Sequence, residues 1–174
     1  MVLQEISKLP INKNSVDDII QYINVDSARF KQLMDLFLNG NVRVSQLTSW
    51  AVGHIAEKHP SLIEPYHNQL LEKLADSSVH NSVRRNIVRI YQTATIPEEI
   101  EGILYDYCLK AINNPKEAIA IRVFGMTVCE RIAKKYIDLI PELIESLSAQ
   151  LHEGSAGFKN RGAKTIKNLT KKNL

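Results

Sequence analysis

Cationic side chains at regular intervals are the residues of this 174-residue chain best suited to chemistry. Arg84, Arg122 and Arg161 recur 38 and 39 residues apart, and a guanidinium can hold a carboxylate or a phosphate through paired hydrogen bonds. Further lysines and arginines stand near these three positions in the sequence. The candidate binding residues are therefore Arg84, Arg85, Arg89, Arg122, Lys134, Lys135, Arg161 and Lys164.

Side chains that could support catalysis or hold a metal form no recognisable motif. His54 and His59 lie five residues apart, so they diverge on a helix, unlike the two ligands of an HExxH motif. Cys108 and Cys129 fall in apolar helical patterns that are typical of buried thiols, and no CxxC pair occurs. The sequence also lacks a glycine-rich phosphate loop and a GxSxG motif. We expect no catalytic residue, no metal and no cofactor, and no small-molecule substrate is evident.

Trp50 is the only tryptophan of the chain, and it lies one helical turn before His54. Core packing is the ordinary role of such a residue. The alternative is a ring that faces a bound partner and makes an aromatic contact with it. Both roles are kept as hypotheses.

Charge is distributed unevenly along the chain. The net charge is +3 at pH 7, yet all 19 acidic residues lie at or before Glu153, so that residues 1–155 carry −3. The basic excess comes from the C-terminal segment, which holds Lys159, Arg161, Lys164, Lys167, Lys171 and Lys172. This pattern argues against a protein that coats DNA with a uniformly basic surface.

Nothing in the sequence indicates a membrane or a secretory route. No apolar run approaches the roughly 20 residues needed to span a bilayer. Met1 to Pro10 includes Glu5 and Lys8 and lacks the apolar core of a signal peptide. We expect a cytoplasmic protein with no membrane partner.

Apolar spacing predicts that helices carry all of these side chains. Leu36, Leu74, Ile112 and Leu151 repeat at the same interval of 38 or 39 residues, which is typical of stacked helix pairs. No useful length alternates with period two, so the predicted fold class is all-α with antiparallel helix pairs. The predicted organisation is one domain over 1–174, with an N-terminal extension at 1–25 and pairs at 26–60, 61–93, 97–136 and 138–170.

Local signals predict where these helices begin and end. Capping boxes at Ser15–Asp18, Ser61–Glu64 and Thr95–Glu98 are expected to start three helices, and Asp26 is expected to cap a fourth. Gly40 is expected to end the Asp26 helix in a left-handed conformation.

The predicted helices alternate in charge. The first helices of three pairs are acidic, with −2 over 61–76, −3 over 97–113 and −4 over 138–153. The second helices are basic, with +3 over 79–93, +3 over 116–136 and +6 over the last helix. The two helices of each of these three pairs thus present opposite charges.

Two kinds of sequence motif resemble HEAT repeats over about residues 26–170. The segments 60–65 (PSLIEP) and 136–141 (YIDLIP) look like the start of that family's first helix. Val83-Arg84 and Ile121-Arg122 resemble the apolar-Arg pair of its second helix. The first and last pairs depart from the pattern, with Ser45-Gln46 and Asn160-Arg161 at that position, as terminal capping repeats often do.

The resemblance implies a right-handed superhelix of about four helix pairs whose second helices line a concave face. That face would be basic, and a non-catalytic binding or scaffold module could hold an acidic protein segment there. The alternative is nucleic-acid binding through phosphates. Arg84, Arg122 and Arg161 have a structural alternative as well, because they could pair with carboxylates of neighbouring repeats.

A more distant resemblance connects the chain to bacterial DNA-alkylation-repair proteins, which are HEAT-like. It implies that Trp50 would stack on a damaged nucleotide, with Glu57 or Glu130 as the carboxylate. No motif of the chain matches the catalytic positions of those proteins, and Trp50 and Glu57 lie two turns apart. We expect no glycosylase activity.

Overall fold

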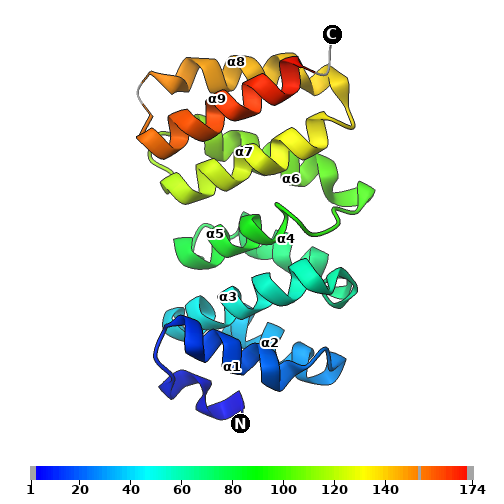
Figure 1. Cartoon of the computed structure of the whole chain (residues 1–174), viewed down its shortest axis with the longest axis vertical. Coiled ribbons are helices and arrows are strands. Elements are labelled where there is room, and N and C mark those ends of the chain that lie inside the picture. The colour runs from blue at the N-terminus through cyan, green and yellow to red at the C-terminus, as the bar shows by residue number, and fades with distance from the viewer. Residues whose placement is uncertain (1–2, 153, 172–174) are drawn as a thin grey trace. The chain divides into compact units, whose positions relative to one another are not determined.

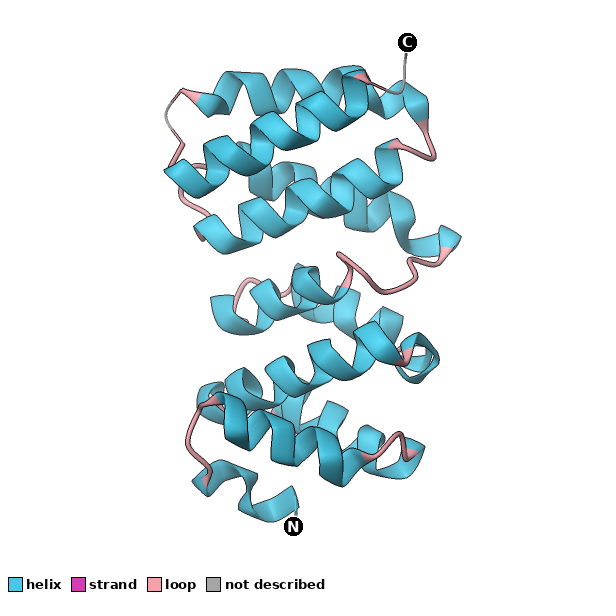
Figure 2. Ribbon diagram, viewed as in Figure 1, coloured by secondary structure: helices cyan, strands magenta, loops and turns pink. Residues whose placement is uncertain are grey.

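Helices make up the whole secondary structure of the described residues, which are 3–152 and 154–171 of a computed structural model (Figures 1 and 2). Those ranges contain nine α-helices, four short 3-10 helices and no strand. The all-α prediction is confirmed. Contacts along the chain divide it into two compact units, with the boundary between Thr95 and Ile96. We describe each unit by itself, and the expectation of a single domain stays a prediction.

The first unit contains five α-helices and three 3-10 helices. Its α-helices are α1 (Lys13–Ile23), α2 (Ser27–Asn39), α3 (Val42–Lys58), α4 (His67–Ala75) and α5 (Asn81–Ile90). The 3-10 helices are η1 (Leu3–Lys8), η2 (Pro60–Leu62) and η3 (Glu64–Tyr66). Helix α3 is central, because α1, α2 and α5 all pack against it.

The second unit contains two consecutive helix pairs. Its elements are α6 (Glu98–Asn113), α7 (Ile119–Ala133), η4 (Ile137–Leu139), α8 (Ile140–Leu151) and α9 (Ala156–Thr170). Helix α6 packs on α7 and α8 on α9, while α7 also contacts α9 and α6 contacts α8. Consecutive pairs of this kind are what the repeating apolar spacing predicts.

The N-terminal segment is bound to the first unit and is not a loose extension. Arg43 of α3 donates hydrogen bonds to the carbonyl oxygens of Ser7 (3.4 Å) and Leu9 (2.7 Å). Helix α1 lies against α3 as α5 does. Residues 13–23 therefore add one more helix beside α3.

Single side-chain acceptors start the first three helices. Asp26 caps α2 as predicted, by accepting a hydrogen bond from the Arg29 amide at 2.9 Å. The capping box expected at Ser15 is wrong, because Asn12 caps α1 and accepts from the Ser15 amide. Asn41 caps α3 in the same way. Asparagine and aspartate favour this position because their short side chains reach the free amides of the first turn.

The capping boxes expected at Ser61–Glu64 and Thr95–Glu98 are also wrong. The first segment forms η2 and η3 in succession, and α4 begins only at His67. Helix α6 begins after Pro97, with no side-chain cap. Proline supplies the backbone angle of a first helical turn without needing a hydrogen-bond partner.

Gly40 ends α2, although not in the left-handed conformation expected. Its φ is −70°, which any residue can adopt. A Cβ at this position would lie 2.3 Å from the Leu36 carbonyl oxygen and 2.9 Å from a methyl carbon of Val44. Close approach of α2 and α3 therefore explains the glycine.

Apolar side chains fill the interior of each unit, and each fully buried one contributes roughly 1.5 to 3 kcal/mol. The first unit buries Phe30, Phe37, Leu47, Ile55, Leu70 and Tyr91, and the second buries Leu104, Cys108, Met126, Cys129, Leu143 and Phe158. Both cysteines are free and buried, as predicted. Helix α9 buries Phe158, Gly162, Thr165 and Leu169.

No helix in the described ranges is both long enough and apolar enough to cross a bilayer.

Candidate binding surface

Helix α5 positions three of the predicted binding residues. Its apolar side chains, Val83, Ile87, Val88 and Ile90, are buried and fix its orientation. The His80 ring caps its start, with Nδ1 3.2 Å from the Ser82 amide. Arg85 and Arg89 then stand one turn apart on the opposite side, where Arg85 is half-buried and Arg89 is exposed.

The arginines of α5 differ in how they are engaged. Arg84 donates a hydrogen bond to the Asn81 side chain. Among the residues that the structure describes, neither the Arg85 nor the Arg89 guanidinium forms a hydrogen bond or an ion pair. These two cations are thus available to a ligand without breaking an existing contact.

Helix α3 lies beside α5 and carries Trp50. Asn86 of α5 donates to the Ser49 hydroxyl at 2.5 Å and so joins the two helices. The half-buried Trp50 ring donates from Nε1 to His54 Nε2 at 2.9 Å. Because Nε2 accepts, the neutral His54 ring carries its hydrogen on Nδ1. Trp50 is accordingly not a core residue, and its ring is held in one orientation.

Arg122 of α7 is engaged inside the second unit. Its side chain donates twice to the Ile112 carbonyl oxygen, at 3.1 and 2.9 Å, and once to Gln150 at 3.1 Å. The guanidinium carbon lies 4.2 Å from the centre of the Phe158 ring. Only 5% of the residue is exposed. Arg122 thus satisfies the carbonyl at the end of α6 and links α6, α8 and α9.

Glu130 is a buried carboxylate that collects two of the predicted cations. It accepts from Lys134 at 2.6 Å and from Arg161 at 2.7 Å. Thr165 and Asn168 of α9 donate to the same carboxylate at 3.1 and 2.8 Å. Burial raises its pKa, but the bonds from Lys134 and Asn168 and the charge of Arg161 outweigh burial, so the pKa lies below its ordinary value. Arg161, Thr165 and Asn168 all lie on α9, so these three donors fix α9 on α7.

Glu101 of α6 likewise binds side chains at the end of α7. Its nearly buried carboxylate accepts from Lys135 at 3.0 Å and from the Tyr136 hydroxyl at 2.7 Å. The bond to Glu101 raises the pKa of Lys135. Lys135 is therefore tied to the neighbouring helix of its own pair.

Lys164 differs from the other cations predicted in the second unit. It is exposed on α9, and within the described ranges its ammonium has no hydrogen bond or ion pair. Lys159, Lys167 and Lys171 are exposed on the same helix, whereas Lys172 lies outside the described residues.

The two carboxylates were not identified as anchors from the sequence. For Glu130 a signal existed, because Lys134 follows one turn later, at the favourable spacing for a helix pair. For Glu101 no such signal existed, since its partners lie 34 and 35 residues away. Glu101 and Glu130 each bind some of the predicted basic residues within the chain, so that these residues are not available to a partner.

Comparison with known proteins gives one match. A family model described as a HEAT repeat domain matches residues 4–173. The chain belongs to the HEAT repeat family. No curated protein and no solved structure matches it, so the resemblance to DNA-alkylation-repair proteins is unsupported.

Membership explains the repeated interval and sets the class of function. HEAT repeat domains are generally protein-binding scaffolds and are usually not catalytic. The match begins at residue 4, so it includes α1, which the sequence had assigned to an extension. The fold alone does not identify a partner. The exposed side chains have to indicate what kind of partner the chain binds.

Proposed function

We propose that this HEAT repeat chain is a non-catalytic binding module that holds an acidic segment of a partner protein on the first unit. The binding residues in this proposal are Arg85 and Arg89, with Trp50 of the adjacent helix as an aromatic contact. We call these three residues the α3–α5 surface. Lys164 of α9 is a further candidate in the second unit.

The two free guanidinium groups of α5 carry this proposal. Half-buried Arg85 and exposed Arg89 stand one turn apart, with no acidic residue within α5, and together carry ten N–H donors for a carboxylate-rich segment. Arginine and tryptophan are also the residue types that most often dominate the energy of protein interfaces. In contrast, Arg122, Lys134, Lys135 and Arg161 already hold groups of their own chain, so we leave them out of the surface.

An acidic protein segment is favoured over nucleic acid by the charge around these residues. Glu57 is exposed on α3, two helical turns from Trp50, and the chain before residue 156 is net acidic. A phosphate backbone with a charge on every nucleotide would meet this repulsion along its whole length. A short acidic segment can place its carboxylates at the arginines alone.

Competition between two labelled ligands tests the proposal. The full chain is titrated at low salt with polyglutamate and with single-stranded DNA, and binding is followed by fluorescence anisotropy. We expect saturable binding of polyglutamate that weakens with salt. Failure of polyglutamate to bind would contradict the proposal. Tighter binding of DNA, with a log–log salt slope of about −2 for three phosphate contacts, would favour the nucleic-acid alternative.

A further inference from the structure

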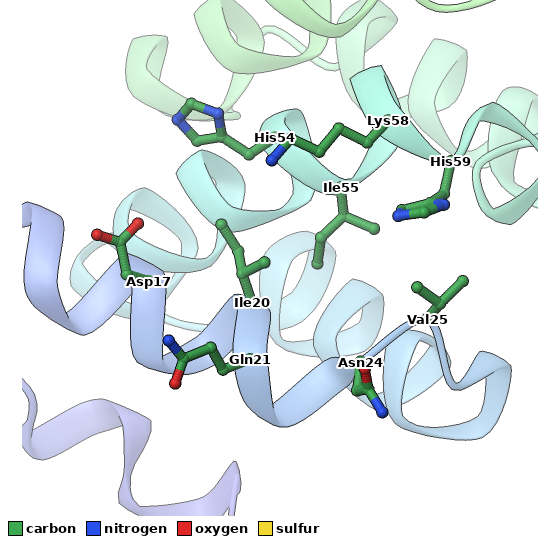
Figure 3. Close-up of a pocket in the computed structure, with 9 residues that line it drawn as sticks. All are labelled: Asp17, Ile20, Gln21, Asn24, Val25, His54, Ile55, Lys58 and His59. Carbon is green, nitrogen blue, oxygen red and sulfur yellow. The ribbon is translucent and has the colours of Figure 1, made fainter.

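A pocket lies between α1 and α3 in the first unit (Figure 3), and neither Arg85 nor Arg89 lines it. Its volume is about 580 Å³, within the range of sites that bind small molecules. Helix α1 and the turn after it form one side, and the last turn and a half of α3 form the other. Its lining residues are Asp17, Ile20, Gln21, Asn24, Val25, His54, Ile55, Lys58 and His59.

The α3 side of this pocket is rich in nitrogen. Figure 3 shows the His54 ring, the Lys58 ammonium and the His59 ring following one another along that side. In the part of the chain that is described, neither the Lys58 side chain nor the His59 side chain forms a hydrogen bond or an ion pair. His54 uses Nε2 to hold Trp50 and keeps Nδ1 for another partner. These donors can meet an anion without first losing a bond.

Negative charge is confined to one end of the pocket. Among the described residues that line the pocket, Asp17 is the only acidic one; it lies toward His54, whereas Asn24 and Val25 lie toward His59 (Figure 3). The Lys58 ammonium lies between the His54 and His59 rings (Figure 3). Like charges repel, so an anion is favoured on the side of this ammonium that faces His59, away from Asp17. The apolar side chains of Ile20, Ile55 and Val25 leave room for a hydrocarbon group beside it.

The turn that brings Val25 to the pocket is strained. Asn24 and Val25 both have positive φ, 43° and 61°, and a β-branched residue seldom adopts this conformation. Val25 is also 49% exposed, so core packing does not explain it. Strain of this kind is concentrated at ligand sites, which agrees with a site for an apolar group here.

We infer that this pocket binds a carboxylate carried on a short branched apolar group. The carboxylate lies between the Lys58 ammonium and the His59 ring, and the apolar group packs on Ile20, Ile55 and Val25. A free amino-acid-like acid and the C-terminal residue of a peptide share this chemistry. The inference goes beyond the proposed function, because no pocket residue belongs to the α3–α5 surface and either site can fail without the other.

NMR titration of the full chain tests the inference with small probes. N-acetyl-leucine has the carboxylate and the branched group, N-acetyl-leucinamide lacks the carboxylate, and N-acetylglycine lacks the branched group. We expect N-acetyl-leucine to shift the backbone amide signals of Asn24, Val25 and His59 saturably, with much smaller shifts from the other two. Unchanged pocket signals, or equal shifts from N-acetyl-leucinamide, would overturn the inference.

Two substitutions with opposite expected effects on the affinity for N-acetyl-leucine test the inference more strictly. Lys58→Met removes the ammonium and should weaken N-acetyl-leucine about tenfold, as for one charge-assisted hydrogen bond. Asp17→Asn removes the repelling carboxylate and should tighten binding. Both residues are exposed, so the fold should tolerate each change. Binding that responds to neither substitution would place the ligand elsewhere.

Blocking the pocket gives a matched control. Gln21 lines the pocket and Gln32 lies on α2, and both are exposed. Gln21→Phe should abolish binding of N-acetyl-leucine, whereas Gln32→Phe should leave it unchanged. Equal affinity in the two variants would contradict the inference.

The source of the ligand is distinguished by a second titration with N-acetyl-Ala-Ala-Leu, which has a free C-terminus. Binding of this peptide with the same variant pattern would identify a peptide C-terminus as an acceptable source. Binding of N-acetyl-leucine alone would identify a free small acid. Binding of neither would overturn the inference.

Discussion

At the scale of single residues, arginines at the same repeat interval have different structural roles. Arg122 is buried against Ile112 and Phe158, and Arg161 holds Glu130. Arg84 contacts its neighbour Asn81. Arg85 and Arg89, whose guanidinium groups form no hydrogen bond or ion pair with the described residues, do not belong to the repeating set. Regular spacing therefore indicates the repeat and does not identify the cations that a partner could bind.

Replacement of Arg122 tests its structural role. Arg122→Met should lower the free energy of unfolding by about 2 to 3 kcal/mol, because it leaves the buried Ile112 carbonyl without its charged donor. Arg85→Met should change that free energy by no more than about 0.5 kcal/mol, as for an unengaged surface residue. Urea unfolding followed by circular dichroism measures both. Equal losses in the two variants would contradict the division of roles.

Glu130 should be among the most sensitive residues of the second unit. Glu130→Gln removes the charge that holds Lys134 and Arg161 and should destabilise the protein by about 2 to 3 kcal/mol. Lys110→Gln, which breaks an exposed pair with Asp106, is the control and should cost less than about 1 kcal/mol. Chemical unfolding of the two variants provides the comparison.

Acid should weaken the protein partly through the same carboxylate. The folded-state pKa of Glu130 lies below its ordinary value of 4.5, so its stabilisation is present above that value. It is lost as the pH falls through the lower, folded-state pKa. The wild-type free energy of unfolding should therefore decline over this acidic range more steeply than that of Glu130→Gln. Parallel pH profiles of the two proteins would show that Glu130 does not titrate as described.

At the scale of elements, helix interiors were predictable from the sequence and several helix starts were not. The apolar spacing of Phe30, Leu33 and Phe37 depends only on the helical period, and it placed α2 correctly. A capping box depends on which of several adjacent acceptors reaches the first free amide. Helix α1 is capped by Asn12, which precedes the expected Ser15. Helix α6 begins after Pro97 without a side-chain cap.

The end of α1 offers a test of an element boundary. Val25→Asn should raise the free energy of unfolding by about 0.5 to 1 kcal/mol, because asparagine tolerates positive φ and little buried surface is lost. Thermal unfolding of this variant beside Val42→Asn, an exposed valine with ordinary φ in α3, isolates the conformational effect. A loss of stability in both would show that the Val25 turn is unstrained.

At the scale of the whole chain, the family and the helix pairing followed from the sequence, whereas the state of each cation did not. The repeat interval depends on residues that every repeat must bury, so one sequence suffices to find it. The contacts of Glu101 with Lys135 and of Glu130 with Arg161 join residues more than 30 positions apart. The pocket between Asp17 and Lys58 arises in the same way. Such pairings depend on how helices pack, which spacing alone does not fix.

Charge reversal on α5 tests whether the α3–α5 surface binds an acidic segment. The double variant Arg85→Glu/Arg89→Glu is compared with Lys31→Glu/Lys116→Glu, which makes the same change of charge at exposed residues outside α3 and α5. Polyglutamate affinity is measured by anisotropy after circular dichroism has shown that both variants keep their helix content. We predict that binding is lost in the α5 variant and nearly retained in the control. Equal affinity in the two variants would show that the α3–α5 surface is not the binding site.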